Sequence, residues 1–260
     1  MRLETLPKKP FPISKITWTI GIIIAILYSA YISNVDLYSL FNNMGEMNSV
    51  LTLMCHPDWS YISYVIDPLL QTIQMAIIGT TLGAIAAIPI SFLAANNICK
   101  NVFIRNFCRF ILNIVRTIPD LLLGSIFVAV LGIGPISGSL ALAIFSFGMI
   151  SKLFYETIET IDNGPLEAIR AVGGSTLNVI FYGVLPQITA SFWGYVLYTF
   201  EINIRASSVL GYMGAGGIGV LLQRSLSQFR YDQTSIIIIS IFIVVWLIDI
   251  INHYIRERLL

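Results

Sequence analysis

The sequence predicts an all-α, polytopic membrane protein with about six transmembrane helices. Hydrophobic residues make up 56% of the 260 residues and charged residues only 11%, whereas about a quarter of the residues of a soluble domain are charged. The apolar residues are gathered into stretches close to the ~20 residues that cross a ~30 Å hydrocarbon layer. Lys and Arg are concentrated in alternate gaps between these stretches. This pattern excludes a soluble enzyme, a secreted disulfide scaffold and a disordered chain.

The apolar stretches that we interpret as spans lie at roughly 16–33, 65–95, 111–131, 139–155, 179–203 and 235–255. The first follows a basic segment and is longer than the apolar part of a signal peptide, so we expect an uncleaved span. Pro89 lies near the end of the second stretch and predicts a kink or an early exit from the membrane. We expect one or two short helices on the outer surface within residues 34–64.

The distribution of basic residues predicts the orientation. Eleven Lys and Arg residues lie in the N-terminal segment, in 96–110, in 152–178 and at the C-terminus, whereas the alternate gaps hold only Arg224 and Arg230. Because basic loops stay on the cytoplasmic side, both termini are expected there. The predicted organisation is an N-terminal tail, first span and external segment over 1–64, a core over 65–255, and a cytoplasmic tail over 256–260.

Several kinds of site are not expected. The three cysteines show no C-x-x-C spacing and the two histidines stand alone, so no metal site is predicted. The net charge is +1 and there is no basic patch that would indicate a nucleic-acid partner.

The loop between the fourth and fifth stretches predicts a short helix at about 164–173. Gly164 can serve as its N-cap and Pro165 as its first residue, while Glu167 complements the positive helix end. Gly173 and Gly174 offer a left-handed stop. Because two turns are not stable alone, this helix must pack on something. We expect it to dock on another protein through an apolar stripe formed by Leu166, Ile169 and Val172.

Glu167-Ala168, followed by Gly173 and by Leu185-Pro186, resembles the EAA motif of ABC-importer permeases. Two positions differ from that motif. Ile169 stands where a second alanine is usual, and Gly183 where an isoleucine is usual. The Glu, Gly and Leu-Pro residues nevertheless keep their spacing.

A longer series of motifs is similar to the permease of a phosphonate-type ABC importer, over about residues 65–255. In chain order the motifs are Arg116-Thr-Ile-Pro-Asp120, Gly148-x-x-x-Lys152-Leu-Phe-Tyr-Glu156, Tyr182-Gly-Val-Leu-Pro-Gln187, Phe200-Glu-Ile-Asn-Ile-Arg205 and Gly211-x-x-Gly-Ala-Gly-Gly-Ile-Gly219. The full series is more specific than the EAA motif alone, which is shared by many importer permeases.

The resemblance implies an ABC type I importer permease fold in a bacterial plasma membrane. It implies contact with a cytoplasmic ATPase dimer, an external substrate-binding protein and a second permease copy, identical or paralogous. ATP and magnesium would be bound by the ATPase chain, so no cofactor and no catalytic site are expected here. The substrate implied is a phosphonate, with phosphite, phosphate or an amino acid left open. The implied ATPase-coupling residues are Glu167, Ala168, Ile169, Gly173, Leu185 and Pro186.

The glycine segment at 211–219 matches G-x-G-x-x-G but lacks the strand and βαβ unit that a dinucleotide site needs. Its glycines instead allow close backbone approach and positive φ angles. One interpretation is a re-entrant stretch beside an outer gate, since irregular backbone at membrane depth must be buried in protein or line a cavity. The other is close helix packing at a subunit contact. The candidate gate glycines are Gly214, Gly216, Gly217 and Gly219.

Charged residues within the apolar stretches are candidates for the translocation path. Glu201 precedes Arg205 by one helical turn, so the two are expected to pair. Alternatively, Arg205 faces the path and meets a passing oxyanion with its guanidinium fork. Arg116 lies near the cytoplasmic end of its stretch and precedes a kink predicted at Pro119, where a gating role is possible.

Two other classes of protein were weighed. An intramembrane enzyme needs a nucleophile–base pair or a metal cluster, and the predicted spans contain neither. A membrane anchor or sensor would not explain an isolated short helix together with an outer glycine segment. Neighbouring genes for an ATPase and a binding protein would favour the transporter.

Overall fold

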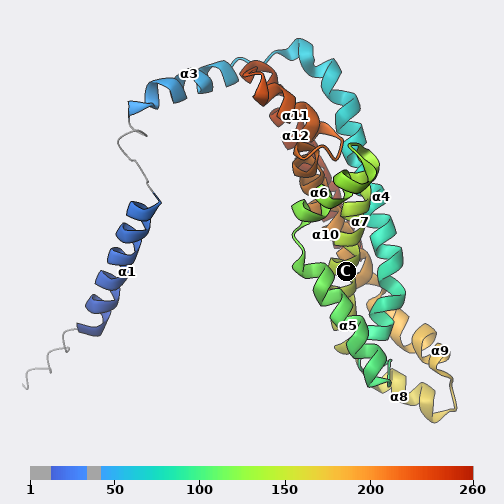
Figure 1. Cartoon of the computed structure of the whole chain (residues 1–260). Coiled ribbons are helices and arrows are strands. Elements are labelled where there is room, and N and C mark those ends of the chain that lie inside the picture. The colour runs from blue at the N-terminus through green and yellow to red at the C-terminus, as the bar shows by residue number, and fades with distance from the viewer. Residues whose placement is uncertain (1–12, 34–41, 260) are drawn as a thin grey trace, which may run out of the picture. The chain divides into compact units, whose positions relative to one another are not determined.

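The computed structural model describes residues 13–33 and 42–259, and in these ranges the regular structure is helical throughout (Figure 1). The chain divides into two compact units, residues 1–52 and 53–260. The first unit contains α1 (Ile13–Ile32) and most of α3 (Met44–Met54). The first apolar stretch is thus helical, although within the described residues its apolar part, Thr17–Ile32, is shorter than the helices that are long enough to cross a membrane. A short helix is present in the segment after it, as predicted. Residues 1–12 and 34–41, which belong to the predicted tail and external segment, lie outside the described residues.

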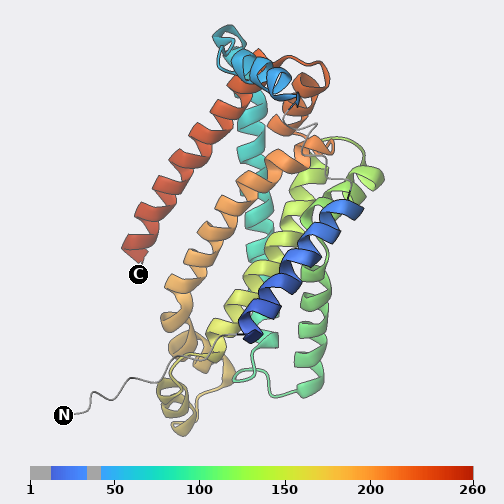
Figure 2. The same cartoon turned by 90° about the vertical axis from the view of Figure 1, so that its left-hand side faces the viewer.

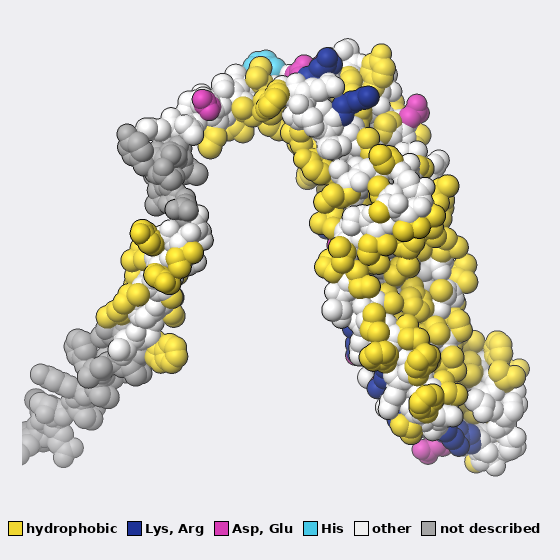
Figure 3. Space-filling view, in the orientation of Figure 1, with side chains coloured by type: hydrophobic (Ala, Val, Ile, Leu, Met, Phe, Trp, Pro, Cys, Tyr) yellow, Lys and Arg dark blue, Asp and Glu magenta, His cyan; other side chains and the backbone are white. Residues whose placement is uncertain are grey.

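Four long apolar helices dominate the second unit: α4 (Ile62–Ala94), α7 (Pro135–Glu159), α10 (Leu185–Tyr212) and α12 (Tyr231–Leu259). With the short helical turns that precede α4 and α10, each is long and apolar enough to cross a membrane. Figure 2 shows α4, α7 and α10 running side by side. Hydrophobic side chains cover much of the flank, and the charged side chains on the visible face lie mostly towards the two ends (Figure 3).

The third predicted span is not one straight helix. The chain forms α5 (Val102–Thr117) and α6 (Asp120–Leu131), which are bent by 87° relative to each other and correspond to a broken span or a re-entrant loop. The break confirms the kink predicted at Pro119, because proline disfavours helical backbone in the residue before it and Ile118 has ψ 121°. The helix also begins well before residue 111, where the prediction started it.

Pro89 does not end its helix. α4 continues five residues beyond it to Ala94, so the proline lies inside the helix. A proline inside a helix removes one backbone hydrogen bond. The helix continues on both sides of this missing bond.

Close packing of α4 against α7 forms the centre of the core. Small residues recur every four positions along α4, and a Cβ on Gly83 would lie 2.7 Å from both the Ala143 carbonyl oxygen and the Phe147 nitrogen. Such small-residue ladders let helix backbones approach closely in membranes. α10 joins this pair through Asn203, whose buried amide donates to Thr80 (2.7 Å) and Ser146 (2.6 Å).

The connections lie at the two ends of the second unit. One end, here the α8 end, carries α8 (Gly164–Ala171), α9 (Thr176–Asn178) and the π-helical segment η2 (Val179–Val184) that leads into α10. The opposite α11 end carries α11 (Ile218–Ser227) and the short helical turn η1 (Trp59–Tyr61). These ends hold most of the candidate site residues.

Candidate functional site

The predicted short helix is present as α8, with ends defined by local capping. Asn163 is its N-cap, one residue earlier than predicted, and the Asp162 carboxylate accepts a hydrogen bond from the Gly164 N–H (2.9 Å). Gly173 ends the helix with φ +82°, a conformation that costs little for glycine alone. Ser175 then caps α9 by accepting from the Asn178 N–H (3.3 Å). The sequence therefore predicted the helix breaks before and after α8. Of the two glycines predicted to form the left-handed stop, only Gly173 has a positive φ.

The apolar stripe of α8 does not face outward as one docking surface. Leu166 is 1% exposed and packs with Val184 and Ile188 of the same chain, whereas Val172 is 86% exposed. Ile169 is half-buried against the same cluster. A two-turn helix must first bury one face on its own chain to be stable, so the predicted stripe is split. The residues presented outward are Glu167, Ala168, Ala171 and Val172.

The two departures from the EAA motif compensate each other in space. Gly183 is buried under α8, and a Cβ placed on it would lie 3.2 Å from the Ile169 Cδ1 atom. A larger residue at 183 would therefore crowd the isoleucine that replaces the usual alanine. Leu185 is half-buried and Pro186 is exposed. The Leu-Pro pair forms the first turn of α10, the helix against which Leu166 of α8 packs.

Polar contacts that the sequence did not reveal surround this loop and the helix ends beside it. Gln187 accepts from the Asp162 N–H (3.0 Å) and donates to its carbonyl (3.2 Å). Arg170 donates to the Asn97 carbonyl (3.2 Å) in the segment between α4 and α5. Arg109 of α5 forms an ion pair with Glu159 at the end of α7. The α8 loop is therefore held to α10 and to the segment between α4 and α5, and α5 is held to the end of α7.

Arg116 and Pro119 share a cavity at the α5–α6 break. The cavity, about 350 Å³, is lined by Arg116, Pro119 and Asp120 together with Val115, Ile118, Phe145 and Met149. The Arg116 side chain is exposed, and within the described residues no ion pair holds it. The structure thus joins two of the predicted path residues in one place, next to an acidic group.

Glu201 and Arg205 pair as predicted, with Nη2 and Oε1 2.6 Å apart. A second arginine was not predicted: Arg256 of α12 lies 3.7 Å from the other carboxylate oxygen. The Glu201 side chain is 14% exposed and that of Arg205 54% exposed. The Glu201 carboxylate is therefore shared between α10 and α12. Arg256 is fifty-five residues from Glu201 along the chain, so local sequence spacing could not predict this second pairing.

The glycine segment is a buried turn between α10 and α11. Gly214, Gly216 and Gly217 have φ between +72° and +90°, and the Gly217 N–H donates to Gln71 of α4 (2.8 Å). Gly219 instead allows α11 to lie close to α10, because a Cβ there would collide with the Ser208 carbonyl oxygen. These contacts are within one chain, and side chains of α4 accept hydrogen bonds from the backbone of the turn.

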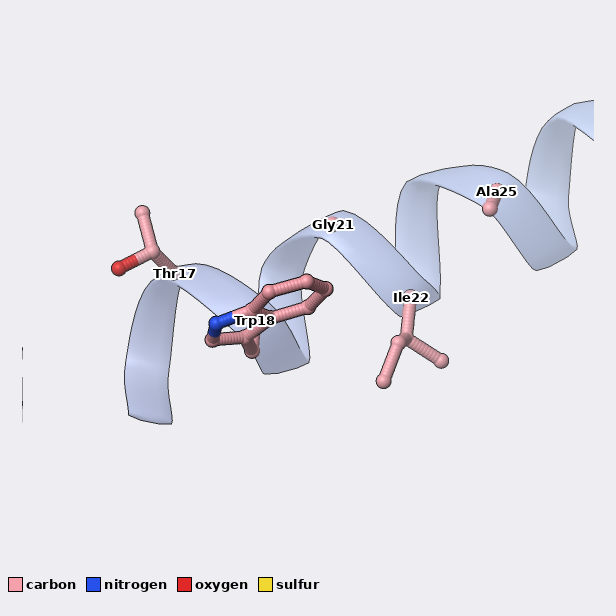
Figure 4. Close-up of a pocket in the computed structure, with 5 residues that line it drawn as sticks. All are labelled: Thr17, Trp18, Gly21, Ile22 and Ala25. Carbon is pink, nitrogen blue, oxygen red and sulfur yellow. The ribbon is translucent and has the colours of Figure 1, made fainter. Parts of the chain in front are cut away.

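A hollow on α1 carries no comparable chemistry. Figure 4 shows Thr17, Trp18, Gly21, Ile22 and Ala25 along one face of this single helix. Thr17, Gly21 and Ala25 repeat every four residues, which is typical of surfaces where membrane helices pack.

Long apolar helices and a capped loop helix packed on them are the features that the resemblance to an importer permease implies. Residues 79–260 match the family of binding-protein-dependent transport system inner membrane components. The chain belongs to this family.

Individual relatives agree with this assignment. The chain is 35% identical to the phosphite transport system permease protein PtxC of Stutzerimonas stutzeri, over 90% of this chain and 86% of that protein. It is 35% identical to the phosphate-import permease protein PhnE of Mycolicibacterium smegmatis, over 92% of this chain and 45% of that protein. It is 43% identical to the putative cryptic phosphonate transport system permease protein PhnE2 of Escherichia coli K12, over 46% of this chain and 98% of that protein.

A solved structure shares the fold. The inward-facing methionine ABC transporter MetNI superposes with a TM-score of 0.68 at 19% identity, covering 78% of this chain and 99% of the matched chain. At this identity the likeness concerns the fold alone.

Proposed function

We propose that this chain is the permease subunit of an ATP-driven importer that moves a phosphonate or a related phosphorus oxyanion. The observation that carries the transport role is α8, which is held on its own chain by Leu166 and exposes Glu167, Ala168 and Val172. The relatives named for phosphite, phosphate and phosphonate transport support the substrate class. A binding protein would supply most of the selectivity.

In the proposed mechanism, a groove of a cytoplasmic ATPase holds the exposed face of α8. ATP and magnesium are bound by that ATPase, and its closure moves α8 in each of two permease copies. The Arg170–Asn97 and Gln187–Asp162 contacts carry this movement to α4 and α10. The spans then open outward to receive the oxyanion from an external binding protein, and hydrolysis restores the inward-facing form.

The test is reconstitution with the candidate ATPase and binding protein in liposomes. Phosphite, phosphate, methylphosphonate and an amino acid are compared as substrates. We expect the loaded binding protein to stimulate ATP hydrolysis and uptake of a phosphorus oxyanion. Uptake of the amino acid alone would contradict the proposed substrate, and absence of any stimulated hydrolysis would contradict the transport role.

The proposed orientation places both termini and the α8 end in the cytoplasm. A cytoplasmic reporter fused after Leu260 is expected to be active. A cysteine replacing Asn48, in a variant whose exposed Cys55 is first replaced by serine, is expected to react with an impermeant thiol reagent in intact cells. Labelling only after permeabilisation would contradict this topology.

Loss of Glu201 is expected to be more harmful than loss of Arg205. Glu201→Gln leaves two guanidinium groups facing each other, whereas Arg205→Met leaves Glu201 paired with Arg256. Breaking a fully buried pair costs ~3–5 kcal/mol; because Arg205 is largely exposed, we expect about 1–2 kcal/mol for Glu201→Gln after allowing for solvent screening.

Thermal unfolding of the purified variants checks this order, with Glu257→Gln as the control at an exposed pair on α12. Uptake per assembled complex tests the separate role in transport. If Arg205 meets the oxyanion, Arg205→Met assembles normally but moves substrate poorly. Full uptake by Arg205→Met would exclude that contact.

A further inference from the structure

A small polar pocket at the α11 end has no role in the function proposed so far. Its volume is about 200 Å³, and its lining residues are Tyr61, Arg224, Ser225, Gln228, Arg230 and Gln233. All six side chains carry a hydrogen-bond donor, although the Ser225 hydroxyl already donates to the Leu222 carbonyl (3.0 Å). No acidic side chain lines the pocket. Among the described residues, neither arginine takes part in an ion pair.

A strained turn brings the two arginines together. At the end of α11 the Phe229 N–H donates to the Leu226 carbonyl (3.1 Å) and the Arg230 N–H to the Ser225 carbonyl (3.0 Å), which is the Schellman arrangement. Its left-handed position is occupied by Phe229, with φ +56°, where glycine is usual. Among the described residues, this is the one non-glycine residue with positive φ. Such strain persists where the surrounding structure holds it, often at functional sites.

The base of the pocket is fixed by buried hydroxyl groups. Ser225 is 3% and Thr234 1% exposed, and the Thr234 hydroxyl donates to that of Ser225 (3.0 Å). The wall formed by η1 is tied to the start of α12, since the Asp58 N–H donates to the Asp232 carbonyl (3.3 Å). Two segments distant in sequence, η1 and the α11–α12 turn, thus hold the donors in place before any ligand arrives.

The charge of the pocket indicates the kind of ligand. Two guanidinium groups that line one small pocket repel each other unless an anion lies between them. Within the described residues, Asp58 forms no ion pair with either arginine; its Oδ1 atom accepts from the Ser60 N–H (3.0 Å) and hydroxyl (2.5 Å). Guanidinium forks, with hydroxyl and amide donors beside them, match the several acceptor oxygens of a phosphate-type group.

We propose that this pocket binds a phosphate-type oxyanion, with Arg224 and Arg230 as its two charged ligands. In the proposed topology the α11 end faces outward, and the pocket receives the oxyanion between the binding protein and the translocation path. The identity of the anion and the outward location rest on the proposed function. The same chemistry fits a free oxyanion and a lipid headgroup, and the experiment separates these sources.

The experiment uses the full chain in nanodiscs of neutral phosphatidylcholine, with radiolabelled inorganic phosphate as the probe. Arg224→Gln and Arg230→Gln are each expected to weaken phosphate binding roughly tenfold or more, as for loss of a charge-assisted hydrogen bond. Arg230→Lys is expected to retain part of the affinity, because it keeps the charge but not the fork. Arg258→Gln, which removes an arginine at the end of α12, is the matched control.

A second arm adds phosphatidylglycerol to the nanodiscs. If the anionic lipid competes with phosphate in the unmodified chain, and if the retention of that lipid falls in both glutamine variants, the headgroup is a ligand of the pocket. Phosphate binding that is equal in both glutamine variants and the control, with lipid retention also unchanged, would overturn the proposal. So would variants that lose only the association with the binding protein.

Uptake by the assembled transporter separates this proposal from the proposed function. If the unmodified complex imports phosphate, phosphite or methylphosphonate, both glutamine variants are expected to reduce uptake at unchanged assembly with the ATPase. If the unmodified complex imports none of them and the variants still lose phosphate binding, the proposed function fails and the pocket stands. Normal uptake and normal phosphate binding in both variants would reject the pocket alone.

Discussion

Gly173→Val is expected to abolish oxyanion uptake while leaving the chain inserted in the membrane. Gly173 has φ +82°, where a β-branched residue costs on the order of 1–3 kcal/mol. Because α8 has only eight residues, this strain is sufficient to unwind its last turn or turn it away from the ATPase. We expect at least a tenfold loss of binding-protein-stimulated ATP hydrolysis, from the ~1.4 kcal/mol that corresponds to each factor of ten.

Glu167→Lys should produce a similar loss for an electrostatic reason. It places a positive charge in the first turn of α8, where the helix end is already positive, on the face presented outward. Gly194→Val is the control for the valine substitution, since a Cβ at Gly194 meets no atom within 4 Å. Stimulated hydrolysis at the unmodified level in both Gly173→Val and Glu167→Lys would remove the coupling role from this loop.

Gly83→Val is expected to prevent assembly of the helical core altogether. The Cβ atom alone would approach backbone atoms of Ala143 and Phe147 to 2.7 Å, and backbone cannot move aside as a flexible side chain can. Overpacking of a core typically costs 1–3 kcal/mol, and separating α4 from α7 also disrupts the buried Asn203–Thr80 hydrogen bond. We expect a large loss of folded chain after detergent extraction.

Ala86→Val, at an exposed position of the same helix, provides the matched control for this prediction. Size-exclusion chromatography measures the folded fraction, and thermal unfolding measures the stability of what remains. If Gly83→Val yields as much monodisperse protein as Ala86→Val, with the same melting temperature, close approach of α4 and α7 is not required for folding.

Part of the site was predictable because it depends on neighbouring residues. Pro165 and Gly173 mark the beginning and the end of α8 through local backbone conformation, and Ser175 caps α9. The Glu201–Arg205 pair follows from one-turn spacing on a helix. The ladder that includes Gly79 and Gly83 was also visible as a G-x-x-x-G pattern typical of membrane helix packing, although the sequence interpretation did not use it.

The sequence by itself determined the class of fold, the approximate positions of the long apolar helices and the approximate ends of α8, since apolar length, capping and proline act over a few neighbouring residues. Only the tertiary structure decided which face of α8 turns inward, that Arg256 shares Glu201, and that Arg224 and Arg230 line one pocket. These arrangements depend on how helices distant in sequence pack. Many sequence-compatible contacts compete for each side chain, and burial in three dimensions selects among them.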